Sequence, residues 1–241
     1  MEAPFDTQAL WGLSLELYEH RRYDDAIDCM LRLKPHLPGN ARLLANLGVA
    51  YRDNGDLEVA EEYLRDASAL SPEDPAIHFN LALTLLRAGR LRAGFREYEW
   101  RWKIRDFAAL HRQFEEPLWG GEPPDGRRIL LYGEQGAGDA IQFVRYAPLV
   151  RAAGGDVVIE VLPHLERLMR WMPGRQWIVT ALTENVQVDV QCPMMTLPRR
   201  FGTELASIPP PAISLAASPV LGRAAEPADA DDYFGERSAA I

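Results

Sequence analysis

A repeat of about 34 residues constrains the first half of this chain more than any other feature of its sequence. In the central copy, apolar residues four positions apart share one face of a first helix, and Asn54-Gly55 predicts the turn that follows. Apolar residues along a second helix form a buried seam, and a small residue in the first helix predicts close helix contact. The template positions are Leu44, Leu47, Gly48, Tyr51, Gly55, Ala60, Leu64, Ala67 and Pro72.

Copies of this template lie one period upstream and one period downstream. The upstream positions are Leu10, Leu13, Ser14, Leu17, Ala26, Met30 and Pro38, and the downstream ones are Leu81, Ala82, Leu85, Gly89, Gly94 and Tyr98. The pattern resembles the tetratricopeptide-repeat family and predicts units at 7–40, 41–74 and 75–108, about the minimum that buries a continuous core. Gly94 stands where the family usually has alanine, which is expected to weaken its helix by up to about 1 kcal/mol.

Two asparagines, Asn46 and Asn80, occupy the same position in consecutive repeats, while the first repeat has Gly12 there. In the tetratricopeptide family this position points toward a concave groove. An asparagine amide both donates and accepts hydrogen bonds, so it can hold the backbone of an extended peptide of any sequence. The resemblance therefore predicts a peptide or protein partner in this groove. The alternative is an asparagine that is solvated or that packs between helices.

Composition and charge argue against several classes of function. The net charge is −9, whereas a nucleic-acid binder normally presents a basic stripe, so no nucleic-acid partner is expected. Cys29, Cys192 and the histidines show no metal-ligand spacing, and neither a metal nor another cofactor is expected. The sequence has no signal peptide and no apolar run of roughly 18–20 residues. We therefore expect no membrane span and a cytoplasmic location.

The third repeat ends in Tyr98, Trp100 and Trp102, which are too large to be left exposed together. We expect them to dock the repeats onto a following domain, and a platform for stacking sugars or bases is the alternative. Residues 109–128 contain many glycines and prolines and predict a connector. Trp119 within the connector is expected to pin it to a surface.

After the connector the pattern changes to alternating strands and helices. Apolar runs predict strands at 129–132, 157–161, 177–180 and 186–190, and helices at 140–153, bent or divided at Pro148, and at 163–172. This alternation predicts a parallel sheet of the Rossmann type. The expected fold class is thus α followed by α/β. A helical solenoid covers residues 1–108, and a single Rossmann-like domain covers residues 129–213.

A glycine-rich turn, residues 133–139, follows the first predicted strand, at the sheet edge where such folds bind ligands. It does not match a phosphate-binding loop, because no Lys-Ser/Thr pair follows it and a third glycine is missing. Glu134 and Asp139 would also repel a phosphate, which a helix N-terminus only partly offsets. Asp139 suits either of two roles there, an N-cap of the helix or a general base that accepts a proton from a sugar hydroxyl.

Several segments together resemble bacterial tetratricopeptide-repeat proteins that carry a glycosyltransferase-like domain. The segments are 97–102, 117–121, 134–146 beginning Glu134-Gln135-Gly136-Ala137-Gly138-Asp139, 192–198 and 208–209. The resemblance covers about 7–213 and implies a B-type, heptosyltransferase-related architecture whose first Rossmann domain receives a sugar acceptor. It implies Asp139 as the candidate base, with an acceptor loop formed by Glu134, Gln135, Gly136, Gly138 and Gln142.

In that family a second Rossmann domain binds the nucleotide-sugar donor, and nothing after residue 213 matches it. Such a domain needs roughly 100–150 further residues. Residues 214–241 are instead rich in alanine, proline, aspartate and serine and predict a disordered tail. We therefore expect this chain to be truncated and incomplete for catalysis.

Two hypotheses of different class follow. In the first, full-length relatives transfer a sugar from a nucleotide-sugar to a protein or glycan acceptor. In the second, the chain is a non-catalytic interaction module whose repeat groove binds a peptide or protein. Residues 186–197 are apolar enough to predict self-association if the surface that a second domain would cover is exposed.

Overall fold

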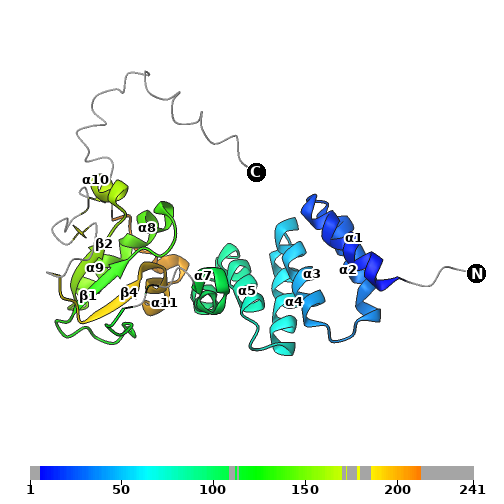
Figure 1. Cartoon of the computed structure of the whole chain (residues 1–241), viewed down its shortest axis with the longest axis horizontal. Coiled ribbons are helices and arrows are strands. Elements are labelled where there is room, and N and C mark those ends of the chain that lie inside the picture. The colour runs from blue at the N-terminus through cyan, green and yellow to red at the C-terminus, as the bar shows by residue number, and fades with distance from the viewer. Residues whose placement is uncertain are drawn as a thin grey trace, which may run out of the picture.

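The computed structural model describes residues 6–108, 112, 114–169, 172, 178–179 and 186–212. Figure 1 shows a row of helices packed in chain order at one end of the molecule, and a sheet with its own helices at the other. No helix in these ranges is both long and apolar enough to cross a membrane. The predicted tail, residues 214–241, lies outside the described residues.

Helix pairs form the described N-terminal part of the chain. The first helix of each pair packs against the second, and each pair packs against the next one along the chain. The pairs are α1 (Thr7–Glu19) with α2 (Tyr23–Leu33), α3 (Ala41–Asn54) with α4 (Leu57–Leu70), and α5 (Pro75–Arg87) with α6 (Leu91–Glu97). A 3-10 helix, η2 (Tyr98–Lys103), and the short α7 (Arg105–Ala108) follow.

The first helix of each pair begins at a capping side chain. Asp6, Asn40 and Asp74 each accept hydrogen bonds from backbone N–H groups two or three residues further along the chain. Such caps satisfy donors that the start of a helix leaves unpaired, and each contributes about 1 kcal/mol. These three residues recur at the repeat period, so their spacing is a further sequence signal for the helix starts.

The close helix contact predicted at Gly48 is confirmed. A Cβ added there would lie 2.6 Å from Leu64 Cγ and 3.0 Å from the Ala60 carbonyl oxygen, so α3 and α4 could not pack as they do. The predicted turn is also present, because α3 ends at Asn54 and Gly55 follows with a φ of 110°, a conformation that favours glycine. Local sequence chemistry thus accounts for the central pair.

Gly94 has a packing reason that its helix propensity does not reveal. A Cβ at this position would lie 2.7 Å from Leu86 Cδ2 and 3.0 Å from the Leu86 backbone nitrogen. Glycine therefore lets α6 approach α5 closely. The closer contact between the two helices offsets the conformational cost expected from a glycine inside a helix.

The C-terminal part is built on a parallel sheet. Its described strands are β1 (Arg128–Tyr132), β2 (Asp156–Glu160), β3 (Ile178–Val179) and β4 (Val190–Pro193), in the order β3-β2-β1-β4. Each neighbouring pair is parallel, with Ile129 opposite both Val157 and Val190. The α-helices of this part are α8 (Ala137–Phe143), α9 (Ala147–Ala152), α10 (Glu166–Met169) and α11 (Leu197–Arg200). Of the third predicted strand, Trp177 and Thr180 lie outside the described residues.

The two predicted helices of this part are more divided than expected. The helix expected at 140–153 begins earlier, at Ala137, and is divided by a 3-10 turn at Val144–Tyr146, so that Pro148 lies in the first turn of α9. Proline fits there because the first turn has no N–H partner to lose. The helix expected at 163–172 consists of a 3-10 turn followed by α10.

The strand predicted at 186–190 is wrong in its bounds. Residues 186–189 are not strand, and β4 runs from Val190 to Pro193. The pairing with β1 sets this register, because the Asp189 carboxylate accepts a hydrogen bond from the Arg128 N–H at 2.7 Å and ends the ladder. A strand buried along its whole length can include Gln191 and Pro193, which apolar periodicity does not select.

The apolar surface expected at residues 186–197 is largely covered, so this reason for self-association is wrong. Residues 190–198 are all buried. The outer edge of β4 is paired with the connector, because the Trp119 N–H donates to Gln191 O at 2.8 Å and the Gln191 N–H donates to Pro117 O at 3.0 Å. Trp119 is only 2% exposed, which confirms that it pins the connector.

One apolar core crosses the boundary between the repeats and the sheet. Phe95 and Tyr98 from the third repeat belong to the same buried cluster as Phe143 and Met195. The rings of Phe95 and Phe143 meet edge to face, with centroids 6.0 Å apart. The docking role expected for residues 97–102 is therefore confirmed for Tyr98. Trp100 instead stacks on His78 within the repeats, with ring centroids 3.9 Å apart.

We predict that Gly48→Ala lowers the free energy of unfolding by about 1–3 kcal/mol, because the added methyl group overpacks the α3–α4 contact. Gly12→Ala is the matched control. It lies inside α1 with no atom within 4 Å of an added Cβ, so it should stabilise the protein by about 0.5–1 kcal/mol. Urea unfolding monitored by circular dichroism measures both. Changes of the same sign and size would contradict the contact.

Candidate functional site

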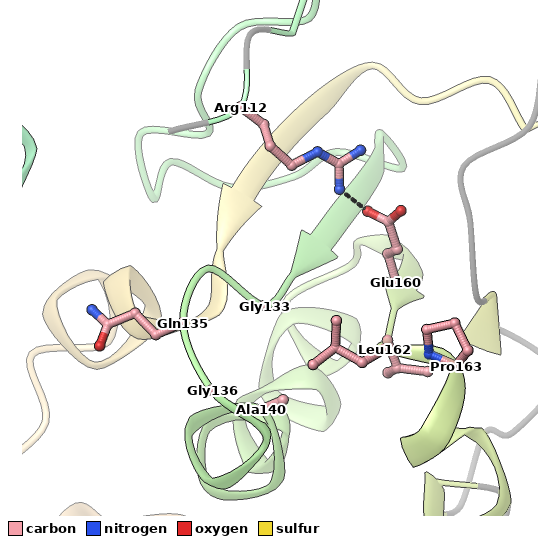
Figure 2. A pocket seen from close by; sticks show the side chains of 9 residues that line it. Arg112, Gly133, Gln135, Gly136, Ala140, Glu160, Leu162 and Pro163 are labelled. Atoms are coloured by element: carbon pink, nitrogen blue, oxygen red, sulfur yellow. Dashed lines mark hydrogen bonds and ion pairs between the residues drawn. The ribbon is translucent and has the colours of Figure 1, made fainter. Parts of the chain in front are cut away.

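A small pocket lies at the carboxyl edge of the sheet, where open parallel sheets bind their ligands. It has a volume of about 110 Å³ and lies between the loop after β1 and the segment after β2. Figure 2 shows Gly133, Gln135 and Gly136 on one side of this sheet-edge pocket, and Leu162 and Pro163 on the other. Its size suits part of a ligand, such as one ring or one small group, better than a whole nucleotide.

An ion pair between Arg112 and Glu160 borders this pocket (Figure 2). The Arg112 guanidinium lies over the rings of Phe114 and Tyr132, with 4.7 Å and 5.6 Å to their centroids. Neither charged residue is among the predicted site residues. Glu160 ends β2, and a carboxylate at the end of a buried strand is a signal that could have found it. Arg112 lies in the predicted connector and gives no such signal.

Glu134 does not line the sheet-edge pocket. Both of its carboxylate oxygens accept hydrogen bonds from Arg101 Nη2 at 3.0 Å, and both side chains are at most 1% exposed. Arg101 also donates to Glu99 at 2.9 Å and to Thr196 Oγ1 at 3.0 Å. We call these four residues the Arg101 cluster. It joins the end of the third repeat to the segments that follow β1 and β4.

Burial and charge act in opposite directions within the Arg101 cluster. Burial raises the pKa of Glu134 to about 7, although the neighbouring Arg101 guanidinium works against this rise. Burial alone would lower the pKa of Arg101, but Glu134 and Glu99 outweigh it and the pKa is raised. Arg101 is therefore permanently charged, and Glu134 is the member of the pair that gains a proton on mild acidification.

The position of the Arg101 cluster limits where the sheet can receive a ligand. β1 and β4 are the neighbours between which the direction of chain progression across the sheet reverses, and ligands favour the crevice at that point. Glu134 follows β1 and Thr196 follows β4, and Arg101 from the repeats bonds to both. The repeats thus occupy this crevice with a side chain of their own. The sheet-edge pocket lies beside the next strand pair, β1 and β2.

Asp139 is not the N-cap of its helix, which corrects one of its two predicted roles. Helix α8 begins at Ala137 with Gly136 as the N-cap, and Asp139 is the third helical residue. Its carboxylate accepts a hydrogen bond from the Gly136 N–H at 3.2 Å and is half-buried. The helix starts earlier than expected because this backward hydrogen bond satisfies the N-cap donor.

The other predicted loop residues are distributed over different surroundings. Gln135 lines the pocket and donates to the Tyr98 hydroxyl at 3.1 Å. Gly136 lines it as well. Gly138 is exposed, and an added Cβ would meet nothing within 4 Å. Gln142 is exposed and lines a different hollow, next to Arg145 and Ile208. The structure thus brings Gln135, Gly136 and Asp139 together and places Gln142 elsewhere.

The face formed by the first helices of the repeats carries a polar bridge. The Tyr18 hydroxyl donates to Asp53 at 2.5 Å, Arg52 donates to the Asn80 side chain at 3.0 Å, and Arg87 donates to the Arg52 carbonyl at 3.0 Å. These bonds connect α1 to α3 and α3 to α5. Burial favours a raised pKa for Asp53, but hydrogen bonds from Arg52 and Tyr18 outweigh it and the pKa is lowered.

The two predicted groove asparagines differ in their contacts. Asn80 accepts from Arg52 and donates to the Ala76 carbonyl at 2.9 Å, so both ends of its amide are engaged. Asn46 is half-buried, and no hydrogen bond of its side chain is found within the described ranges. Asn46 is therefore the one of the two whose amide is available to a ligand.

We predict that Arg101→Met lowers the free energy of unfolding by about 3–5 kcal/mol at neutral pH, because Glu134 is left buried without its cation. The raised pKa fixes the sign of the pH dependence. The folded state binds the Glu134 proton more tightly than the unfolded state, so stability falls as pH rises from about 4.5 toward 7. Without Arg101, which lowers the Glu134 pKa, this pKa should rise further, so the loss caused by Arg101→Met should be largest above pH 7 and shrink as the pH falls and Glu134 is protonated in both proteins. Urea unfolding at several pH values measures this.

The double variant Arg101→Met with Glu134→Met is the control for this prediction. Replacing a buried ion pair by apolar side chains is often neutral or stabilising, so most of the stability should return. A double variant as unstable as the single one would show that packing, and not charge, is lost in Arg101→Met.

Comparison with known proteins identifies the repeats. Residues 45–99 match the family model described as tetratricopeptide repeat. Protein FlbA of Caulobacter vibrioides is 34% identical over 136 residues, which are 54% of this chain and 22% of that protein. The chain thus spans about a fifth of the length of this curated relative.

Similar solved structures are matched over less than two thirds of this chain. The first repeat domain of Spaghetti (RPAP3) with an HSP90 peptide has a TM-score of 0.39 and 22% identity, covering 42% of this chain and 79% of that one. The Yersinia enterocolitica chaperone SycD with a YopD peptide has a TM-score of 0.40 and 20% identity, and the match covers 43% of this chain and 82% of that one. The O-GlcNAc transferase of Thermobaculum terrenum has a TM-score of 0.40 and 19% identity, and the match covers 64% of this chain and 36% of that one. The sequence match establishes that residues 45–99 are tetratricopeptide repeats, within the solenoid of α1 to α6.

Proposed function

We propose that this chain is a protein-interaction module whose repeats bind an extended peptide segment on the face of α1, α3 and α5. The observation that carries the proposal is the polar bridge across this face. It holds the first helices of successive repeats together through Asp53, Arg52 and Asn80, and leaves the amide of Asn46 available. A prearranged surface binds a flexible peptide with less ordering cost than a mobile one.

Within this proposal the two asparagines have different roles. Asn46 contacts the peptide backbone. It is half-buried, and its neighbour Ala45 belongs to the core, so its amide is held at the surface of α3. Asn80 is a positioning residue, since its amide is used by Arg52 and Ala76. The bridge also supplies charge of both signs, with Arg87 about half exposed and Asp53 less so. A peptide therefore meets both donors and acceptors.

We predict that Asn46→Ala weakens peptide binding about tenfold, since one good hydrogen bond to a desolvated backbone is worth about 1.4 kcal/mol. The probe is a peptide selected from a random phage-displayed library on the immobilised chain, labelled with a fluorophore and titrated by anisotropy. The control is Glu62→Ala, an exposed residue of α4. If Asn46→Ala and Glu62→Ala bind the selected peptide equally well, Asn46 is not a contact residue.

A second candidate function is a glycosyltransferase-like one for the α/β part. The observation that favours it is the parallel order β3-β2-β1-β4, which is the order of one half of a doubly wound Rossmann sheet together with its first strand beyond the reversal. We propose that residues 129–213 are a Rossmann-like domain, joined by the connector 109–128 to repeats at 7–108. On this proposal the chain acts in the cytoplasm.

In this candidate the sheet-edge pocket receives part of a sugar acceptor. Gln135 and Gly136 line the pocket, and Asp139, in the first turn of α8, accepts a hydrogen bond from the Gly136 N–H. Asp139 is therefore the proposed base, and Gly138 and Gln142 are proposed acceptor-loop residues. Glu134 helps to position this loop through its hydrogen bond from Arg101. A nucleotide-sugar donor would bind to a second domain of a longer protein.

We predict that Asp139→Asn, in a protein that includes such a second domain, lowers the rate of sugar transfer by about 10²–10⁴-fold, the usual contribution of a general base. The asparagine oxygen can still accept the Gly136 N–H bond, so the melting temperature should change little. Turnover from a radiolabelled nucleotide-sugar measures the rate. Equal turnover in the variant and the wild type would remove Asp139 as the base.

A further inference from the structure

A continuous hollow surface runs along the junction between the third repeat and the C-terminal part. It consists of three adjoining hollows of about 590, 490 and 320 Å³. The first and second share Arg92 and Ala93, and the second and third share Leu91 and Leu205. We call this surface the junction trough. One side is formed by residues 86–96 and the other by residues 199–208, with part of α8 at the far end.

One end of the junction trough is basic. Arg92 and Arg96 from α6 face Arg199 and Arg200 from α11 across the first hollow. Arg92 packs over Gly202, because its guanidinium lies 3.2 Å from the position of an added Cβ there. Arg96 is exposed. Four arginines from two distant segments therefore gather in one hollow of a chain whose net charge is −9.

Two of these arginines are only partly neutralised. Arg92 has an ion pair with Glu204 at 3.4 Å, in which both side chains are more than 60% exposed. Arg199 has one with Glu99 at 3.2 Å. The Arg92–Glu204 pair is exposed on both sides and contributes little stability, whereas Glu99 in the second pair is only 14% exposed. The basic end can therefore receive carboxylates from another chain.

The other end of the junction trough is mainly apolar, although Arg87, Gln142 and Arg145 also line it. Leu86, Phe95 and Phe143 line it, and Leu205 and Ile208 border it with 64% and 41% of their surfaces exposed. Large apolar side chains that are exposed beside a hollow indicate a place where another apolar group is buried. The trough thus changes along its length from a lining dominated by arginines to a mainly apolar one.

We propose that the junction trough docks an extended segment of a partner protein, with acidic residues at the basic end and large apolar side chains at the other. The elongated shape fits a single extended chain, and the change of lining sets the direction in which its residues must be arranged. The net charge of −9 and the mainly apolar lining of the other end disfavour nucleic acid as the occupant. This site goes beyond the peptide face of α1, α3 and α5, and uses different residues.

The test titrates the full chain into fluorescein-labelled synthetic peptides and follows anisotropy. The probe is Asp-Glu-Asp-Gly-Leu-Phe-Leu. One matched peptide replaces its acidic residues by lysine, and another replaces its apolar residues by serine. We expect saturable binding of the probe below about 1 mM, with both matched peptides at least tenfold weaker. Absence of probe binding up to that concentration, or equal binding of the lysine peptide, would overturn the proposal.

Variants locate the binding. Arg92→Glu with Arg96→Glu should weaken binding of the probe at least about tenfold, because the charge at the basic end is reversed. Leu205→Ser should separately weaken binding at the apolar end. The charge-matched control is Arg32→Glu with Arg167→Glu, two exposed arginines outside the trough. Melting temperatures establish that each variant is folded. A loss as large in the control as in the trough variant would show a general charge effect and contradict the site.

Asn46→Ala separates this inference from the proposed peptide face. Probe binding that is unchanged in Asn46→Ala and lost in the Arg92 and Arg96 variant supports the junction trough whatever the fate of the other face. Binding that is lost only in Asn46→Ala places the probe on the repeats and removes the trough proposal.

Discussion

The buried guanidinium of Arg101 is the interaction on which the arrangement of the whole molecule depends. A charge removed from water costs several kcal/mol unless it is fully paired and hydrogen-bonded. The two terminal nitrogens of Arg101 find partners on three segments, because Glu99 belongs to the repeats, Glu134 follows β1 and Thr196 follows β4, whereas its Nε has no partner among the described residues. These partners converge only when the solenoid and the sheet are docked. The apolar contact of Phe95 with Phe143 then adds to a junction that charge has already specified.

This junction fills the centre of the sheet edge with a side chain from the repeats. The crevice between β1 and β4 is occupied by Arg101, and the pocket that remains beside β1 and β2 is small. The larger concave surface lies where the third repeat meets residues 199–208. The junction also creates this surface, because neither the repeats nor the sheet form it alone.

The repeats and the alternation of strands and helices could be predicted because their signals are local. Leu47, Gly48 and Leu64 mark the helix contact within one repeat, and Asp6, Asn40 and Asp74 recur at its period. The bounds of β4 could not be predicted, since Gln191 and Pro193 enter a buried strand only because β1 and the connector lie on either side of it. Part of the pocket lining was predictable, because Gln135 and Gly136 lie in the glycine-rich turn, whereas the contribution of Arg112 came from outside any motif.

The sequence by itself determined the repeat solenoid, the connector with its buried Trp119, and the parallel α/β part, since helix periodicity, turn residues and apolar runs act over a few residues to a few tens of residues. Only the tertiary structure decided the partner of Glu134 and the surface where α6 meets residues 199–208. Arg101 is 33 residues from Glu134 and 95 from Thr196, and no local pattern states which charge will be buried with which. The physical reason is that leaving a charge unpaired costs much free energy only in the buried interior. That interior forms only when the chain folds, so the sequence does not show which two charges will be paired there.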